Sequence, residues 1–359
     1  MLQRTAIVGM LAATGLLLAA CAGAPNKTQE PAEAADWARV ERVALQVFRG
    51  GRALCGRAVA PTLGVAYTNR ESFNRALQPA TDKELGLDDH LKVTRIVDGS
   101  PAAKAGLQIG DVLESIGGRL APTGRGAVEA FADQVRALPA GDRPVPLEVE
   151  RGGVTQTLTV TPELACDFGV TVMVGDQVNA YTNGRTIRVM SGLLGMVVSD
   201  DELALVLSHE VGHNVMNHIL LQKWQAMGGA AAGAFLDLLA AAGGVDTHGK
   251  FINAGAEAGW RRHSVGRERQ ADYVGLYIMA RAGYNIEVAP QLWRRMAALM
   301  PRRTEVMPTH PTPPDRIIAM EKTVAEIKAK QAAGQPLVPD EATIARLGQD
   351  TPATPAAAN

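Results

Sequence analysis

The sequence predicts an α+β protein in which a β-rich domain is inserted into a mostly helical domain with a small β-sheet. Short apolar or alternating runs separated by turn residues fill residues 56–165, as in a β-rich domain. Longer stretches with helical spacing of apolar residues dominate residues 166–330. The chain of 359 residues is long enough for both parts, since a single domain usually holds about 100 to 200 residues.

The first 20 residues are expected to be a secretory signal peptide, because one early arginine is followed by an apolar run that ends in small residues. The last of these match a bacterial lipoprotein cleavage box, so we expect Cys21 to carry the lipid of a membrane-anchored periplasmic protein. A retained membrane helix or a leader without lipidation is the alternative. Ala22 stands where aspartate would signal retention, which favours the outer membrane. Residues 21–35 are small and polar, as expected of a tether.

Charge and cysteine content narrow the functional class and the compartment. Lys and Arg number 36 and Asp and Glu number 37, so the formal net charge is −1 and no nucleic-acid partner is expected. Cys55 and Cys166 remain after removal of the leader. In an oxidising compartment we expect them to pair as a disulfide, and two free buried thiols are the alternative.

The inserted segment, residues 56–165, contains the passage VTRIVDGSPAAKAGLQIGDVLESIGG, which resembles a PDZ domain of the kind found in bacterial periplasmic proteases. The expected strands are LGVAY, LKVTRIV, DVLESIGG, PLEVE and TQTLTV, and the expected helix is GAVEAFADQVRAL. The resemblance implies that exposed peptide termini bind there as an added strand. Residues 63–65 resemble the carboxylate-binding loop, and an ordinary strand start is the alternative.

The stretch SHEVGHNVMNH, residues 208–218, lies in a predicted helix that begins after the N-cap residue Ser199. His209 and His213 are four residues apart, so both imidazoles lie on one helical face and can bind one ion. Glu210 completes an HExxH pattern, in which the glutamate takes a proton from the water that zinc activates. A capped helix with solvated histidines is the alternative.

A third ligand is expected from the downstream segment RERQADYVG. Glu268 can supply the carboxylate of a His2Glu site for one Zn2+ ion, with the fourth position open for water. Asp272, one turn later, is expected to accept a hydrogen bond from a zinc-binding histidine. A solvated charged face is the alternative for both. His218 would face the far side of a continuous helix, so we expect it to have a structural or supporting role.

Three motifs, HEVGH, ERQAD and THPTPPDRI, together resemble the zinc metallopeptidase family that includes HtpX and the CAAX prenyl proteases. The resemblance covers roughly residues 178–323. It implies a mostly helical catalytic domain with zinc bound by His209, His213 and Glu268. It also implies that Glu210 is the general base.

In the same family, a histidine before proline and a later arginine stabilise the oxygen of the reacting carbonyl. The resemblance therefore implies this role for His310 and Arg316. A surface turn is the alternative for His310. The transmembrane helices of the two named members are not expected here, so a prenylated substrate is not expected either.

The segments around this motif set have expected roles as well. Asn179, Ala180 and Tyr181 are the expected substrate-binding edge, on which an extended peptide would pair as an added strand. Residues 227–244 are expected to form a small-residue helical hairpin over the active-site cleft that can move as a lid, with plain core helices as the alternative. His248, just after this segment, could swing toward the zinc.

Residues 36–55 and 331–359 flank the two domains. Trp37, Val40 and Val43 recur with helical spacing, so residues 36–55 are expected to be an N-terminal helix of the catalytic domain. Residues 331–359 are expected to be a flexible tail.

These observations predict a zinc metalloendopeptidase of the bacterial cell envelope. It would hydrolyse misfolded or unassembled envelope proteins, and PDZ capture of their termini would raise their local concentration. The alternative is a non-proteolytic assembly factor for outer-membrane proteins, in which the PDZ domain binds and the zinc site is silent or latched. The complete set of His209, Glu210, His213 and Glu268 favours the enzyme.

Overall fold

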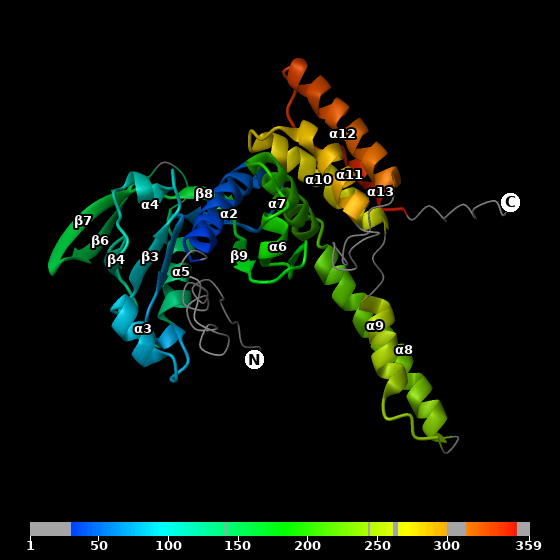
Figure 1. Cartoon of the computed structure of the whole chain (residues 1–359), viewed down its shortest axis with the longest axis horizontal. Helices are drawn as coiled ribbons and strands as arrows, with labels where there is room; N and C mark the ends of the chain where they lie inside the picture. The colour runs from blue at the N-terminus through cyan, green and yellow to red at the C-terminus, as the bar shows by residue number, and fades with distance from the viewer. Residues whose placement is uncertain are drawn as a thin grey trace. The chain divides into compact units, whose positions relative to one another are not determined.

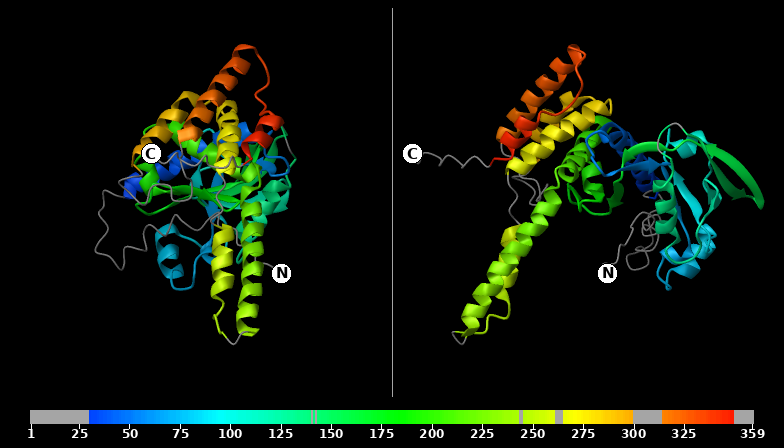
Figure 2. Two further views of the ribbon diagram at one scale, coloured as in Figure 1. Left: turned by 90° about the vertical axis from the view of Figure 1, so that its right-hand side faces the viewer. Right: turned by 180° about the vertical axis from the view of Figure 1, so that it is seen from behind.

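The computed structural model describes residues 30–139, 141, 143–242, 245–260, 265–299 and 314–349 (Figures 1 and 2). The chain divides into two compact units, and the boundary falls between Thr171 and Val172. The expected leader, Cys21 and His310 lie outside the described residues. Among the described helices, none combines the length and the apolar character that crossing a membrane requires.

The first described helix, α2 (Glu30–Gly51), begins six residues before the expected start at Asp36, so residues 30–35 of the expected tether are helical. Pro31 lies in the first turn, where its missing N–H costs no helical hydrogen bond. The apolar face of α2, including Val40, Val43 and Val47, is fully buried. The helix packs on β8 (Glu163–Cys166) and belongs to the first unit, although we had expected it in the catalytic domain.

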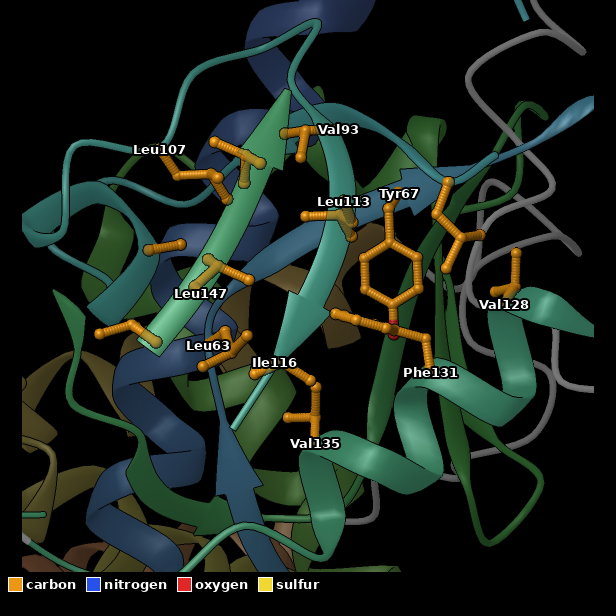
Figure 3. Packing of buried hydrophobic residues seen from close by; sticks show 14 of the residues in the cluster. Leu63, Tyr67, Val93, Leu107, Leu113, Ile116, Val128, Phe131, Val135 and Leu147 are labelled. Carbon is orange, nitrogen blue, oxygen red and sulfur yellow. The ribbon is translucent and has the colours of Figure 1, made fainter. Parts of the chain in front are cut away.

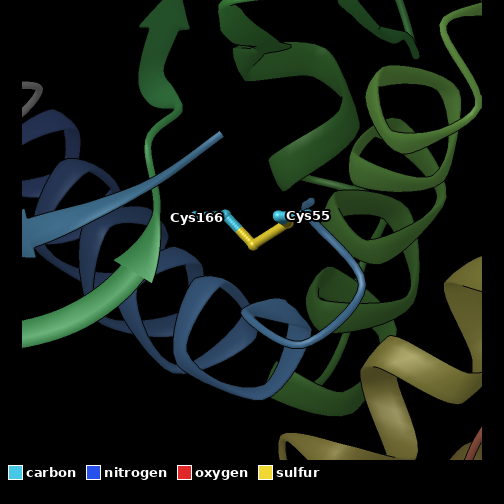
Figure 4. The surroundings of a disulfide bond; sticks show 2 residues. All are labelled: Cys55 and Cys166. Atoms are coloured by element: carbon cyan, nitrogen blue, oxygen red, sulfur yellow. A yellow bond between two sulfur atoms is a disulfide. The ribbon is translucent and has the colours of Figure 1, made fainter. Parts of the chain in front are cut away.

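A disulfide joins Cys55 to Cys166, so the thiols are not free (Figure 4). β1 (Val59–Thr62) pairs antiparallel with β8, and Val59 lies opposite Cys166. The covalent bond and this strand pair hold together the two ends of the inserted segment, whose cysteines are separated by 111 residues.

The first unit is built on a six-stranded sheet with the order β2-β3-β4-β6-β7, in which β5 pairs with β4 and all pairs are antiparallel. α5 (Ala127–Arg136) packs on it, and the ring of its Phe131 meets Tyr67 edge to face with centroids 5.0 Å apart (Figure 3). The remaining elements are β2 (Val65–Thr68), η2 (Arg70–Ser72), α3 (Gln78–Leu85), β3 (Lys92–Ile96), α4 (Pro101–Lys104), β4 (Val112–Ile116), β5 (Arg119–Leu120), β6 (Val145–Arg151) and β7 (Val154–Val160).

A small three-stranded sheet has the order β10-β11-β9, so β10 is an edge strand, and the boundary between the two units falls within β9. Its strands are β9 (Gly169–Met173), β10 (Ala180–Thr182) and β11 (Thr186–Met190). The turn between β10 and β11 uses Asn183, whose side chain accepts hydrogen bonds from the amides of Arg185 and Thr186. Gly184 follows with a φ of 94°, a conformation that glycine adopts without strain.

Helices make up the rest of the second unit. α7 begins after Ser199, whose hydroxyl accepts a hydrogen bond from the amide of Glu202 at 3.2 Å. Every residue of α7 from Glu202 to Asn214 is buried, which suits a central helix. The elements are α6 (Ser191–Leu194), α7 (Asp200–Val215), α8 (His218–Ala242), α9 (Lys250–Trp260), α10 (Val265–Arg281), η3 (Ile286–Val288), α11 (Ala289–Leu299), α12 (Pro314–Ala332) and α13 (Glu341–Leu347).

The expected flexible tail is ordered over residues 331–349. α13 has a conventional start, because the carboxylate of Asp340 accepts a hydrogen bond from the amide of Thr343 at 2.7 Å. The amide of Asp340 in turn donates to the hydroxyl of Tyr273 on α10 at 3.1 Å. The expectation of a flexible tail was wrong for residues 331–349. Contacts with α10 hold α13 in place, and the composition of the tail does not indicate these contacts.

Candidate metal centre

Two glycines bring α7 and α10 unusually close together. A Cβ atom added to Gly212 on α7 would lie 2.6 Å from the carbonyl oxygen of Ala271 on α10. One added to Gly275 on α10 would lie 2.9 Å from the carbonyl oxygen of Ser208 on α7. Both distances are far too short for a real side chain, so the two backbones are in direct contact. This contact lets short side chains from the two helices reach one common point.

The common point is formed by His209, His213 and Glu268, all of them buried. The Nε2 atoms of the two histidines lie 3.1 Å apart. The Oε2 atom of Glu268 lies 3.4 Å from Nε2 of His209, and its Oε1 atom lies 3.4 Å from Nε2 of His213. One ligand atom from each residue therefore lies within 4.8 Å of the others, which is close enough for all three to bind one ion.

Asp272 orients the first histidine. Its Oδ1 atom lies 2.8 Å from Nδ1 of His209, so Nδ1–H can donate to the carboxylate while Nε2 faces the common point. Burial alone would lower the pKa of His209, but hydrogen bonds and charge from Asp272 and Glu268 raise it to about 10. A cation that binds here must displace the proton, because imidazole binds metals in its neutral form.

A chain of hydrogen-bonding contacts orients the second histidine. Nδ1 of His213 lies 3.0 Å from Nδ1 of His218, and Nε2 of His218 lies 3.0 Å from Oε1 of Gln270. The amide nitrogen of Gln270 donates to the carbonyl of Ile344 on α13 at 2.9 Å. Burial lowers the pKa of His218 to about 4, so this ring is neutral and can accept the proton that Nδ1 of His213 offers.

His218 reaches this position because the helix does not continue as expected. Asn217 has a φ of 55°, a left-handed conformation that asparagine tolerates, and it separates α7 from α8. The ring of His218 therefore folds back onto His213 and does not face the opposite side of a single helix.

Arg316, which we expect to stabilise the reacting oxygen, lies against two carboxylates of the site. It is fully buried, and its Nε and Nη2 atoms each donate to Asp272 at 2.8 Å. Its Nη1 atom lies 3.2 Å from Oε2 of Glu268. The guanidinium carbon lies 4.5 Å from the ring centroid of Trp293, and that ring also meets His209 edge to face. Arg316 is thus committed to the carboxylates that support the site.

Glu210 follows His209 on α7 and is 1% exposed. The expected substrate edge lies on or beside β10, where Asn179 and Ala180 are buried and Tyr181 is half-buried. The hydroxyl of Thr182 at the end of β10 donates to the side-chain oxygen of Asn214 on α7 at 2.8 Å. This bond connects the edge strand to the residue that directly follows His213.

The donor set fits zinc. Two imidazole nitrogens and one carboxylate oxygen form the ligand set of catalytic zinc sites, which leave a fourth position for water or substrate. Both histidines have a partner on Nδ1, which is the arrangement found behind zinc-binding imidazoles. Sequence reasoning named these three candidate ligands. It missed Trp293, Gln270 and the two contact glycines, of which only the glycines left a signal, as small residues at helical spacing from the motifs.

Comparison with known proteins agrees with this assignment. Residues 158–324 match the model of peptidase family M48, and residues 92–151 match the model of a PDZ domain. The mitochondrial metalloendopeptidase OMA1 of Schizosaccharomyces pombe is 31% identical over 155 residues, which cover 41% of this chain and 44% of OMA1. The beta-barrel assembly-enhancing protease of Yersinia pestis is 26% identical over 169 residues, which cover 44% of this chain and 35% of that protein.

The similar solved structures align with only a part of the chain. An HtrA-type protease, AlgW, with a bound decapeptide covers 30% of this chain at 26% identity, with a TM-score of 0.24. The HtrA3 PDZ domain with a phage-derived ligand covers 30% of this chain and 88% of its own length, at 19% identity and a TM-score of 0.23.

The chain spans less than half the length of the curated relatives named above. Within these limits the matched segments agree with the geometry, because the M48 match includes all three ligands and the PDZ match lies inside the six-stranded sheet. Residues 158–324 are therefore similar to peptidase family M48, and residues 92–151 are similar to a PDZ domain.

Proposed function

We propose that the protein is a zinc-dependent metalloendopeptidase, with one Zn2+ per chain held by His209, His213 and Glu268. The observation that carries this proposal is the convergence of three buried ligand atoms, within 4.8 Å of one another, from two helices in direct backbone contact. Two histidines four residues apart on a helix can occur by chance. A carboxylate from a second helix reaches the same point only if the fold packs the two helices together, so it is the stronger evidence.

Each residue around the site has a separate task in peptide hydrolysis. Zinc, when bound, supplies Lewis-acid chemistry that polarises the peptide carbonyl and makes water acidic enough to attack at neutral pH. Glu210 takes the proton from the attacking water and passes it to the leaving amine. Asp272 and His218 hold the two histidines in one tautomer each, and Arg316 compensates the charge of two carboxylates.

The substrate class is proposed to be misfolded or unassembled proteins of the bacterial cell envelope. The signal-peptide and lipoprotein pattern at the N-terminus supports a periplasmic enzyme anchored through Cys21. The name of the Yersinia pestis relative supports a task in beta-barrel assembly. An extended chain would pair with the edge strand β10 beside Asn179, Ala180 and Tyr181. The PDZ domain would hold an exposed terminus and raise the local concentration of substrate.

Exchange of Glu210 for glutamine tests the proposal, because it removes the base and leaves the three ligands in place. We expect Glu210→Gln to retain one zinc per chain by elemental analysis and to cleave unfolded casein about 100- to 10,000-fold more slowly than wild type. Glu287→Gln, a change of an exposed glutamate on η3, is the matched control and should keep full activity.

Two outcomes would contradict the proposal. Casein cleavage by Glu210→Gln at the wild-type rate would remove Glu210 from the reaction. One zinc per chain with no turnover by the wild-type protein would favour the non-proteolytic assembly factor with a silent or latched site.

A further inference from the structure

The helical hairpin formed by α8 and α9 exposes many of its large apolar side chains to solvent. α8 and α9 lie side by side in both views and pack on each other (Figures 1 and 2). A Cβ atom added to Gly233 of α8 would overlap the carbonyl of Phe251, and one added to Gly255 of α9 would overlap the carbonyl of Gly229. The interface is thus made of glycines, in a G-x-x-x-G spacing on α8 that suits close packing of helices surrounded by lipid.

Five large apolar residues of α8 form a stripe along the helix, and Leu221, Leu236 and Leu239 are exposed beside it. The five residues of the stripe recur at helical spacing, and each is more than half exposed: Leu220, Trp224, Met227, Phe235 and Leu238. At about 100° per residue the stripe lies about 120 to 180° around the helix from Gly233, on the side away from α9. The alternative of plain core helices is therefore wrong for these side chains, which are exposed, and the place of the hairpin over the cleft stays a prediction.

The polar groups of the hairpin are kept off the stripe. Asp237 is the one charged residue in the sequence between Trp224 and Val245, and it lies on the α9 side. Its carboxylate accepts hydrogen bonds from the hydroxyl of Thr247 and from the amides of Phe251 and Ile252, at 3.3 and 2.9 Å for the amides. These bonds satisfy the carboxylate within the hairpin, on the side away from the apolar stripe.

Residues at both ends of the stripe suit the surface of a bilayer. Lys223 stands beside Trp224 at one end, a pair whose ring and long side chain reach the headgroup level of a membrane. Asp246 and His248 lie exposed at the turn near the other end, where headgroups and water can solvate them.

We propose that α8 lies in the plane of a phospholipid bilayer surface, with its apolar stripe among the acyl chains and α9 on the aqueous side. An exposed apolar stripe that runs along the helix, with polar residues near both ends, is a feature of helices that lie in the membrane interface. Few basic residues flank the stripe, so apolar contact drives the binding and anionic lipid is not required. Neither the zinc site nor the lipid on Cys21 is needed for this contact.

Fluorescence from a label on the stripe tests this placement in the full chain. Leu238→Cys, labelled with an environment-sensitive dye, is compared with His248→Cys at the exposed turn and with Leu120→Cys, an exposed apolar position on β5. Cys55 and Cys166 are paired and do not react, and labelled wild type corrects for Cys21. Unchanged zinc content checks that each variant is folded.

With phosphatidylcholine vesicles, the Leu238→Cys label should shift to the blue and be quenched by a quencher on the acyl chains, at low and at high salt. The two control labels should stay accessible to aqueous iodide. Adding Phe235→Glu to the labelled Leu238→Cys chain should weaken the response to vesicles about tenfold or more, because it removes one large apolar contact.

Three results would overturn the proposal. The Leu238→Cys label could remain accessible to iodide while the protein is bound to vesicles. It could shift without vesicles and more strongly at higher protein concentration, which would assign the stripe to a second copy of the chain. It could shift only when unfolded casein is added, which would assign the stripe to polypeptide.

Discussion

In both helix pairs, α7–α10 and α8–α9, glycines allow the two backbones to touch. The pairs differ in their surroundings, because α7–α10 is buried and α8–α9 leaves its large apolar side chains exposed. In α7–α10, Gly212 and Gly275 bring the backbones together inside a buried core, and the close approach serves a cluster of polar side chains. In α8–α9, Gly233 and Gly255 do the same, and the large apolar side chains remain exposed. A glycine contact therefore shows only that two helix backbones are close. The function of the contact depends on the side chains around it.

The largest expected effect tests the buried charges that only α7–α10 contains. Arg316→Ala should destabilise the protein by about 3–5 kcal/mol, because the carboxylates of Asp272 and Glu268 lose their buried counter-charge. Urea unfolding measures the change. The control is Arg294→Ala, which removes an exposed partner of Glu321 and should cost less than about 1 kcal/mol. Equal losses in the two variants would mean that Arg316 does not support the site.

The same substitution made in both helix pairs sharpens the comparison directly. Gly212→Ala places a methyl group against the carbonyl of Ala271 and should cost about 1–3 kcal/mol, with loss of zinc as Glu268 moves away. Gly233→Ala should separate α8 from α9 and leave the zinc content unchanged. Elemental analysis and thermal unfolding of both variants measure these outcomes. Similar zinc loss from Gly233→Ala would show that the two pairs are not independent.

Much of the site could be predicted from residue spacing, because a helix places residues i and i+4 on one face. This rule applies to His209 with His213 and to Glu268 with Asp272. Spacing carries no information about how two helices cross. The backbone contact at Gly212 could therefore not be predicted from the motifs.

The contacts of Arg316 and His218 could not be predicted from spacing, for similar reasons. The role expected for Arg316 came from resemblance, and its burial between two carboxylates depends on how α12 packs against α10. His218 depends on a single left-handed residue, Asn217, which interrupts a pattern that otherwise continues as a helix. In the first unit the strands were predictable, because alternating runs and glycine turns are local signals, whereas the docking of α2 on β8 is not local.

A smaller effect is expected where a histidine acts through a ligand. His218→Gln removes the ring that orients His213 and should weaken zinc binding about 10- to 100-fold, as measured by competition with a chelator. His90→Gln changes an exposed histidine of the first unit and should leave zinc affinity unchanged. An unaltered zinc affinity in His218→Gln would show that the contact between His218 and His213 does not contribute to zinc binding.

The smallest expected effect is on the pH dependence of stability, through the packing of α12 against α10. Burial would raise the pKa of Glu326, but hydrogen bonds from the hydroxyls of Tyr277 and Tyr273 hold that pKa below its usual value. The native carboxylate therefore binds fewer protons than the unfolded one. Its contribution to stability is present above pH about 4.5 and is lost as the pH falls through the lowered value.

Glu326→Gln should remove this part of the acid sensitivity. Urea unfolding midpoints of wild type and variant, compared between about pH 6 and pH 3, should differ most at the upper end and converge at the lower end. A constant difference over the range would contradict the expected protonation of Glu326.

X-ray absorption at the zinc edge of the purified protein tests the central assignment most directly, because it reports the atoms around the metal without reference to activity. The account predicts one zinc per chain, with two imidazole nitrogens at about 2.0–2.1 Å, a carboxylate oxygen, and a change in this shell on Glu268→Ala. A zinc shell with sulfur ligands, or one unchanged by loss of the Glu268 carboxylate, would contradict a site shared between α7 and α10.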